Sequence, residues 1–185
     1  MTISMTSNAA KRIKVWDIGV RLFHWTMVAS VASAYFLAEQ RVLHRRLGYV
    51  VIALIGFRLI WGLIGTHHAR FVNFVPGPRR FFSYLRDMAR GSEARYLGHN
   101  PAGAAMIVAL LATLAAVAGT GYMVGMDAWF GVEWVEDAHK LLVNLLLVLV
   151  ALHVGGVVLS SRRHRENLVL AMVTGKKDVA QDEHV

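Results

Sequence analysis

Residues 138–159, AHKLLVNLLLVLVALHVGGVVL, form an almost wholly apolar stretch that carries two histidines, His139 and His153. At about 100° and 1.5 Å per residue, an α-helix places these imidazoles within about 40° around its axis and roughly 21 Å apart along it. Because the hydrocarbon layer of a bilayer is about 30 Å thick, the two side chains would lie at two depths on one face of a membrane-spanning helix. Polar groups at such depths mark functional sites. The spacing therefore predicts two ligand positions on a single helix.

The amino-acid composition is that of an integral membrane protein, because 56% of the 185 residues are hydrophobic and only 17% are charged. Four stretches are apolar nearly all round and long enough to span a bilayer, at about residues 20–37, 47–64, 101–122 and 138–159. All four are expected to be helices, since an open sheet edge in lipid leaves backbone groups unpaired. We predict an all-α, integral membrane four-helix bundle that forms a single domain over residues 1–185, with an exposed tail at 178–185.

Basic residues predict the orientation of this bundle. Most of them lie within residues 11–21, 70–95 and 162–177, on the side where the chain begins and ends; the other side has Arg41, Arg45, Arg46 and Lys140. The positive-inside rule then places both termini in the cytoplasm. The net charge of +8 is explained by this topology and by basic loops near anionic membrane lipid, so no nucleic-acid partner is predicted. Residues 79–90 have the pattern of an amphipathic helix on the cytoplasmic surface.

Cysteine is absent from the chain. This excludes disulfides, iron–sulfur clusters and thiolate metal sites, together with covalent haem attachment through a C-x-x-C-H motif. Any haem would therefore be held without a covalent bond, by axial ligands and packing.

Depth in the membrane indicates how the histidines of the spans can pair. His24 lies a turn or two inside the cytoplasmic end of the first span, and His153 precedes the basic Arg162-Arg163 pair by about 13 Å of helix. His44 and His139 begin the second and fourth spans at the outer boundary. Two bis-histidine sites are predicted, His24 with His153 and His44 with His139, and haem iron is the expected metal. Alternatively, a histidine at the edge of a span only makes interfacial hydrogen bonds.

Arg58 is a charged residue inside the second span. Its side chain either extends to the inner interface or pairs with a haem propionate. Glycines lie near two of the histidines, with Gly48 one turn after His44 and Gly155-Gly156 directly after His153. They would leave room for a flat tetrapyrrole, although small residues also serve to pack membrane helices closely.

Seven short strings occur in order along the chain: RLFHW (21–25), HRRLGY (44–49), RLIWG (58–62), HARF (68–71), YLGHNP (96–101), AHK (138–140) and HRENL (164–168). Together they resemble the bacterial cytochrome b561 and nickel-hydrogenase b-type cytochrome subunit family, which is also similar to the membrane subunits of formate dehydrogenases. The resemblance implies four helices in the bacterial inner membrane and two haem b groups. It also implies the pairs His24/His153 and His44/His139, in agreement with the pairing from depth.

The resemblance further implies a quinone pocket near the cytoplasmic haem, where the third span begins. His99 and Asn100 lie there, although Asn100 before Pro101 is typical of a plain helix start, which is the favoured interpretation of these two residues. The leading hypothesis is a di-haem b-type cytochrome without catalytic residues of its own. It would carry electrons across the membrane between the quinone pool and an outer redox protein, namely a hydrogenase, a dehydrogenase or a c-type cytochrome.

Two other functions are considered. Some members of the same family resemble superoxide:quinone oxidoreductases, and the outer cluster Arg41, Arg45, Arg46 and Lys140 would then attract the superoxide anion instead of contacting lipid headgroups. A metal-ion transporter or a membrane scaffold is the remote alternative. Transporters usually carry carboxylates inside the membrane, and the interiors of these four stretches contain none.

Overall fold

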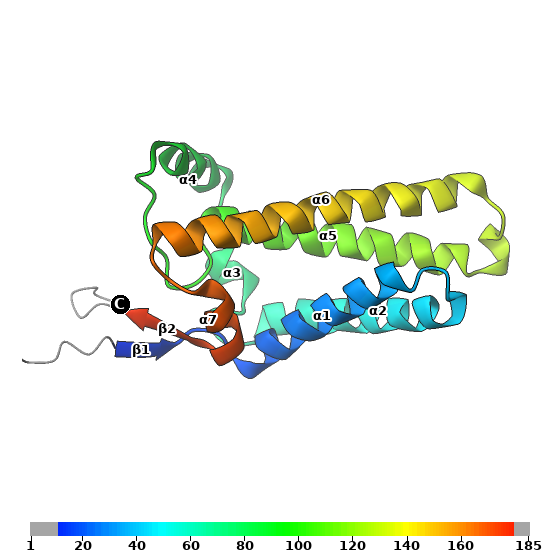
Figure 1. Ribbon diagram of the computed structural model, residues 1–185, viewed down its shortest axis with the longest axis horizontal. Coiled ribbons are helices and arrows are strands. Elements are labelled where there is room, and N and C mark those ends of the chain that lie inside the picture. The colour runs from blue at the N-terminus through cyan, green and yellow to red at the C-terminus, as the bar shows by residue number, and fades with distance from the viewer. Residues whose placement is uncertain (1–10, 180–185) are drawn as a thin grey trace, which may run out of the picture.

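The computed structural model describes residues 11–179 and is mostly helical (Figure 1). Four long helices run back and forth along one axis: α1 (Ile18–Phe36), α2 (Arg41–Ile64), α5 (Pro101–Val124) and α6 (Glu133–Arg163). Shorter elements connect them, namely α3 (Phe71–Phe74), α4 (Pro78–Arg90), the 3₁₀ helix η1 (Asp127–Trp129) and α7 (Leu168–Thr174). The strands β1 (Lys11–Lys14) and β2 (Lys176–Val179) lie at the two ends of the described chain.

Three of the four expected spans are long and apolar enough to cross a membrane, and these are α2, α5 and α6. The shorter α1 has 19 residues and carries the polar side chains of Arg21 and His24 in its first two turns, which lowers its mean hydropathy. Large apolar side chains on the outer faces are exposed, for example Phe36 at 81% and Leu63 at 73%. Such faces suit a lipid environment and not water.

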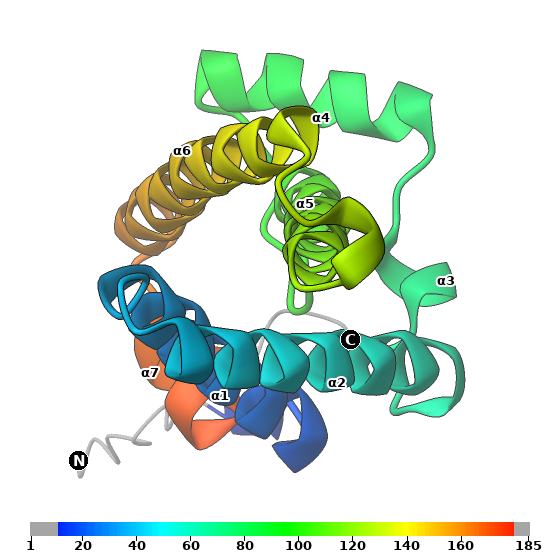
Figure 2. The ribbon, with the colours of Figure 1, turned by 90° about the vertical axis from the view of Figure 1, so that its right-hand side faces the viewer.

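The long helices pack in the order α1 on α2, α2 on α5 and α5 on α6. Their shared core is a cluster of five buried residues, Met27, Val51, Ile55, Leu114 and Leu146. Within the described chain, α6 does not pack closely along α1 or α2. Figure 2 shows the result, with α5 and α6 on one side and α1 and α2 on the other. Each long helix thus packs on the next long helix along the chain, while α6 does not pack closely along α1 or α2.

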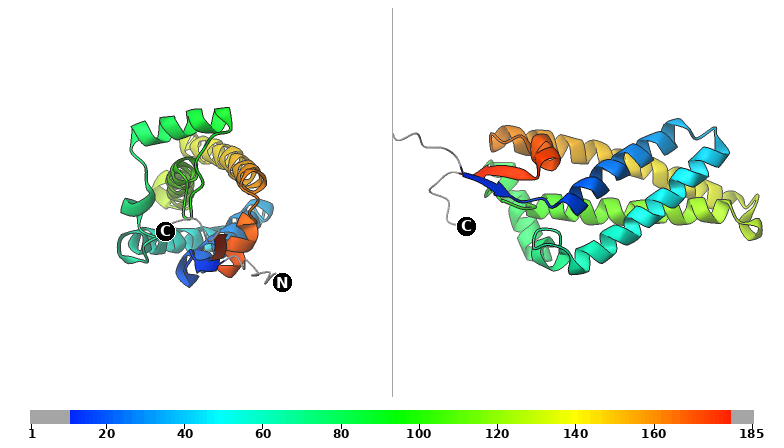
Figure 3. Two further views of the ribbon diagram at one scale, coloured as in Figure 1. Left: turned by 90° about the vertical axis from the view of Figure 1, so that its left-hand side faces the viewer. Right: turned by 90° about the horizontal axis from the view of Figure 1, so that it is seen from below.

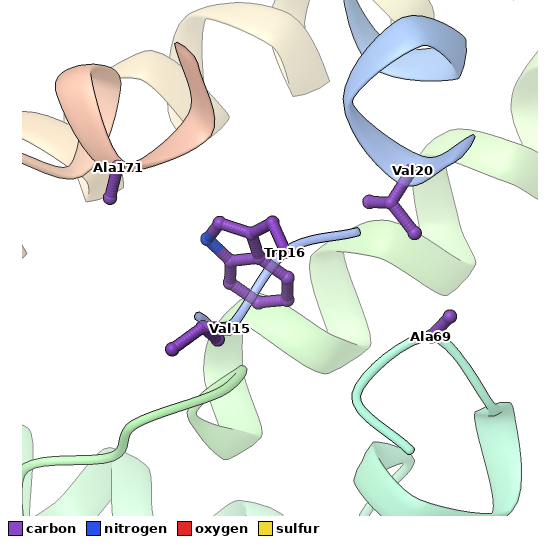
Figure 4. Packing of buried hydrophobic residues seen from close by; sticks show 5 residues of the cluster. All are labelled: Val15, Trp16, Val20, Ala69 and Ala171. Carbon is purple, nitrogen blue, oxygen red and sulfur yellow. The ribbon is translucent and has the colours of Figure 1, made fainter. Parts of the chain in front are cut away.

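Both ends of the described chain join at one end of the bundle in one packed unit, here called the clasp. It comprises β1, β2, α7 and the start of α1, and its core is Val15, Trp16, Val20, Ala69 and Ala171 (Figure 4). β1 pairs antiparallel with β2, from Lys11 opposite Val179 to Lys14 opposite Lys176. The main-chain N–H groups of Val15 and Trp16 both donate to the carbonyl of Gly175, at 2.8 and 3.1 Å.

The clasp adds a small sheet to the expected helical fold. The described chain is mostly helical, as predicted, but it also contains this two-stranded sheet, and residues 178–179 of the expected tail belong to β2. Residues 180–185 of that tail lie outside the described residues. Two four-residue, lysine-rich strands show no hydrophobic alternation, so their pairing depends on distant backbone groups that sequence periodicity does not reveal.

Asp17 links the clasp to the bundle. Its carboxylate caps α1 by accepting from the Val20 N–H at 3.0 Å, and it also accepts from Trp61 Nε1 at 3.2 Å and Thr66 Oγ1 at 2.6 Å. Burial raises the pKa of Asp17, but these hydrogen bonds outweigh it, so the pKa lies below its usual value of 3.8. One side chain thereby fixes the beginning of α1 against the end of α2.

The amphipathic helix expected at residues 79–90 is confirmed as α4, Pro78–Arg90. Pro78 stands at its first turn, and Gly91 ends it with a left-handed φ of 70°. The end-on views in Figures 2 and 3 show α4 lengthwise, so it lies across the axis of the long helices. Its C-terminal end is held by Arg163 of α6, whose guanidinium donates to the Met88 carbonyl and the Glu93 carboxylate, both at 2.8 Å.

Candidate functional site

His44 of α2 and His139 of α6 meet at one end of the bundle. Their ring centroids are 6.3 Å apart and their planes are inclined by 84°. In both rings Nδ1 faces a backbone carbonyl, that of Ala34 at 2.9 Å for His44 and that of Val117 at 3.1 Å for His139. Because a carbonyl oxygen only accepts, Nδ1 of each ring carries the proton, and the lone pair is left on Nε2. In the neutral rings, Nε2 is therefore the nitrogen that is left to bind a ligand.

Two neighbouring residues of α5 complete the surroundings of His139. Thr120 Oγ1 lies 3.1 Å from Nδ1 of this histidine and donates to the carbonyls of Ala116 and Val117, so it accepts from the ring. Gly121 leaves the space in which the ring lies, because a Cβ at that position would be 3.0 Å from His139 Cε1. The Nδ1–Cε1 edge of the ring is thus held by hydrogen bonds and lies in the space that the missing side chain of Gly121 leaves.

His24 of α1 and His153 of α6, the second predicted pair, interact electrostatically. Nδ1 of His24 is buried and has no hydrogen-bond partner among the residues that the structure describes. An unpaired buried nitrogen destabilises a protein by about 1–3 kcal/mol, so such groups call for a partner. The edge of the His24 ring contacts Trp25, with centroids 5.0 Å apart.

Arg58 is buried in the second half of α2, with 3% of its surface exposed. Its guanidinium donates to the Ala69 carbonyl at 3.1 Å and lies over the ring of Phe71, 4.6 Å from the centroid. The side chain therefore extends toward the loop that follows α2, as the interface alternative expects. Its pairing with a haem propionate stays a prediction.

His99 lies between two aromatic rings, with Trp16 at 4.5 Å and Phe74 at 4.6 Å between centroids. Its Nδ1 is buried without a hydrogen-bond partner in the described chain. Burial, followed by the charge of Arg58, lowers the pKa of His99 to about 3, so the ring is neutral at physiological pH. Asn100 caps α5 by accepting from the Gly103 N–H at 2.7 Å, which confirms the helix-start interpretation. Quinone contact by these two residues stays a prediction.

The family model of prokaryotic cytochrome b561 matches residues 15–175, which is nearly the whole described chain. The chain belongs to this family. The resemblance noted from the sequence strings is thereby confirmed, and the family is one of helical membrane proteins that carry b-type haem and transfer electrons in the membrane.

Among the curated relatives of this cytochrome b561 chain are proteins described as probable Ni/Fe-hydrogenase B-type cytochrome subunits. The one from Bradyrhizobium diazoefficiens is 23% identical, over 89% of this chain and 85% of the relative. Those from Azotobacter vinelandii and Rhizobium leguminosarum bv. viciae are 27% and 24% identical, over 88% and 89% of this chain and 87% and 88% of the relatives. No solved structure matches the chain.

The residues present fit the b-type haem that the family implies. Imidazole nitrogens bind transition metals at about 2.0–2.1 Å, so two rings on one metal have centroids about 6 Å apart, close to the separation of His44 and His139. No group of three or more metal-binding side chains occurs in the described part of the chain. A bare metal ion needs such a group, whereas a haem supplies four nitrogens and requires only two axial ligands.

Each pair joins α6 to a helix along which it does not pack closely, α2 for His44 and α1 for His24. A Cβ placed on Gly48, Gly155 or Gly156 would meet no atom within 4 Å, so these positions are open. Space for a flat tetrapyrrole beside His44 and His153 stays a prediction.

Sequence reasoning missed Thr120, Gly121, Trp16 and Phe74. Each contacts a predicted site histidine from another segment of the chain. No spacing rule links such distant positions, and threonine, glycine and aromatic residues are common in membrane helices and loops. Only the folded arrangement identifies them.

Proposed function

We propose that this chain carries electrons across the bacterial inner membrane, between a redox protein at the outer face and a quinone at the cytoplasmic side. Two haem b groups would be held without covalent bonds, the outer one by His44 and His139 and the inner one by His24 and His153. The observation that carries the proposal is the outer pair, whose rings lie 6.3 Å apart with both Nδ1 groups bonded to carbonyls. Haem b bound there would supply reversible one-electron iron chemistry.

The surroundings of the histidines serve this role by fixing the rings before anything binds. A carbonyl that accepts from Nδ1–H sets the tautomer, limits ring rotation and makes Nε2 a better donor to metal. Two histidines would hold each haem, and such a haem would supply electron-transfer chemistry. The two levels are roughly 21 Å apart along α6, so one rigid helix would fix both of them.

The topology that we propose has four spans, with α1 as the fourth and both termini in the cytoplasm. The polar residues that lower the hydropathy of α1 support a functional span. Arg21 reaches out of the bundle and donates to the Val173 carbonyl in the clasp, so its charge need not enter lipid. His24 interacts electrostatically with His153, and the inner haem would be held between them.

The quinone would bind beside the inner haem, near His99 and Asn100. His99 supports this placement because its unpaired Nδ1 is buried and it interacts electrostatically with His153. A neutral imidazole can donate or accept one hydrogen bond with a quinone oxygen, depending on its tautomer. Arg58 also interacts electrostatically with His99 and would favour an anionic group, whether a haem propionate or a reduced quinone.

The outer partner would dock on the connection between α5 and α6. Phe130 is 80% exposed there and Trp134 is 57% exposed, with Trp129 in edge contact with Trp134. This surface continues into α6 a short distance from His139. Because relatives are named as hydrogenase subunits, a hydrogenase is the first partner to test, and a dehydrogenase or a c-type cytochrome are the others.

The test is a reduced-minus-oxidised absorption spectrum of the purified protein, with haem quantified as the pyridine haemochrome. Wild type should contain two b haems per chain. His24→Ala and His44→Ala should each retain one, and the double variant none. His67→Ala is the matched control, because His67 is exposed and belongs to neither pair. Absence of haem from the wild-type protein, or full haem content in both single variants, would overturn the proposal.

A further inference from the structure

α4 lies outside the group of four long helices and across their axis, level with the cytoplasmic ends of α5 and α6 (Figures 1 and 2). It packs against α5, and the contacts of Arg163 with Met88 and Glu93 fix it to the end of α6. When the long helices span a bilayer, a helix at right angles to them at this level lies parallel to the membrane surface. Its position is therefore that of an interfacial helix, held there by a buried carboxylate.

The helix has three distinct faces at about 100° per residue. Tyr84 is buried and marks the face that contacts the rest of the protein. Phe82, 66% exposed, and the exposed Ala89 lie on a second, apolar stripe. The third face is a basic stripe of exposed arginines that are seven and four residues apart, Arg79, Arg86 and Arg90.

The basic stripe adjoins the apolar one and has little negative charge of its own. Asp87 is the sole carboxylate of α4, and it approaches Arg86 only to 4.0 Å, with the Arg86 side chain 65% exposed. Arginine stems lie along apolar surface while their guanidinium groups reach polar headgroups, and the guanidinium fork matches phosphate oxygens in pairs. Three guanidinium groups beside an inserted phenylalanine thus match the boundary between phosphates and acyl chains.

We propose that α4 binds anionic phospholipid of the cytoplasmic leaflet, with Arg79, Arg86 and Arg90 on the phosphates and Phe82 among the acyl chains. The choice of anionic lipid rests on the opposite charges of the arginine stripe and the membrane, since the cytoplasmic leaflet is negative and attracts basic segments close to spanning helices. This surface is separate from the histidine pairs, so the inference does not depend on haem binding or on electron transfer.

The first part of the test measures where α4 lies. The chain has no cysteine, so a nitroxide can be attached to Ala89→Cys on the apolar stripe or to Ser83→Cys, about 120° away around the helix. Both native residues are small and exposed, which makes them a matched pair. In nanodiscs containing phosphatidylglycerol, the label at 89 should be relaxed by lipid-soluble oxygen and the label at 83 by a water-soluble nickel chelate. Equal exposure of both labels to the chelate would overturn the proposal, as would spin–spin broadening at 89 that reveals a second copy of the chain.

The second part measures lipid preference by counting phosphatidylglycerol and phosphatidylcholine molecules retained on the holoprotein in native mass spectra. Arg86→Gln should lower the ratio of anionic to zwitterionic lipid about fivefold, and the variant with all three stripe arginines changed to glutamine should lower it more than tenfold. Arg80→Gln is the control, because Arg80 lies on another face of α4 over the Tyr96 ring. Equal effects of Arg86→Gln and Arg80→Gln would refute specific binding by the stripe.

Discussion

Gly121→Ala is a small change that tests the outer histidine pair directly. The added Cβ would lie 3.0 Å from His139 Cε1 and 3.4 Å from Nδ1, so the ring must move by a few tenths of an ångström. Within residues 11–179, the direct hydrogen bonds of this ring run from Nδ1 to Val117 and Thr120, both already 3.1 Å long and near the upper limit for N–H···O contacts. A further displacement weakens the contacts that aim Nε2.

The expected loss follows from the role of such contacts in metal sites. Removing a hydrogen bond that orients a ligating histidine typically lowers metal affinity about 10–100-fold, equivalent to about 1.4–2.7 kcal/mol. Gly121→Ala should therefore weaken outer haem binding by that factor and leave the inner haem unchanged. The assay is competitive haem transfer to an excess of apomyoglobin, followed by the pyridine haemochrome, in which one of the two haems should leave the variant faster than wild type.

Gly119→Ala is the matched control on the same helix. Position 119 is exposed, and a Cβ there meets no atom within 4 Å, so the substitution should leave both haems in place. Wild-type haem retention in Gly121→Ala would refute the reasoning that this close contact positions His139. Equal haem loss in both alanine variants would attribute the effect to α5 in general and refute it as well.

Three further predictions concern the clasp, the quinone site and the outer charges. Asp17→Ala removes the cap of α1 and should lower stability by about 1–2 kcal/mol in thermal melts followed by tryptophan fluorescence. The pKa of Asp17 in the folded protein is lowered, so the stability difference between wild type and Asp17→Ala should be complete above about pH 4, near the unfolded pKa. It should vanish as the pH falls through the lower, folded pKa. His99→Gln should raise the quinol concentration needed for half-maximal haem reduction several-fold. Since the pKa of His99 is about 3, its contribution should show no titration between about pH 5 and 8; an inflection there would contradict the assignment. Charge reversal, Arg45→Glu with Arg46→Glu, should leave superoxide-driven haem reduction unchanged if the chain serves a protein partner, and a large decrease in stopped-flow rate would favour superoxide oxidation.

The long helices were predictable from the sequence because a chain that crosses the lipid bilayer must be apolar there. The residues at which these helices begin and end were not predictable. The second stretch was expected at residues 47–64, but α2 begins at Arg41, and α6 runs from Glu133 to Arg163 instead of 138–159. Hydropathy detects only the part inside the hydrocarbon, whereas backbone hydrogen bonds continue the helix into the headgroup region, where charged side chains are stable.

The pairing of histidines by depth is compatible with the structure, since His44 lies beside His139 and His24 interacts with His153. The depth of a residue in the membrane can be predicted from the sequence because an α-helix rises by about 1.5 Å per residue. The direction in which a side chain points cannot be predicted in this way. Arg58 could be placed inside a span, but its contact with Ala69 depends on how the following loop folds back. The same limit applies to the clasp, whose strands are far apart in the sequence.

The position of α6 connects fold and function. Among its described residues only Val135 and Leu146 are buried, and it packs closely along α5 but along neither α1 nor α2. Yet α6 contributes one histidine to each pair, and the partner histidines lie on exactly those two helices. In lipid there is little hydrophobic force to draw apolar helices together, so contacts between them depend on packing and on specific polar bonds. The groups that the histidines are predicted to bind would therefore add to the existing ties between α6 and the α1–α2 side, which are Leu146 in the shared core and the clasp. It follows that loss of either histidine pair should loosen the bundle on that side while the α5–α6 contact persists.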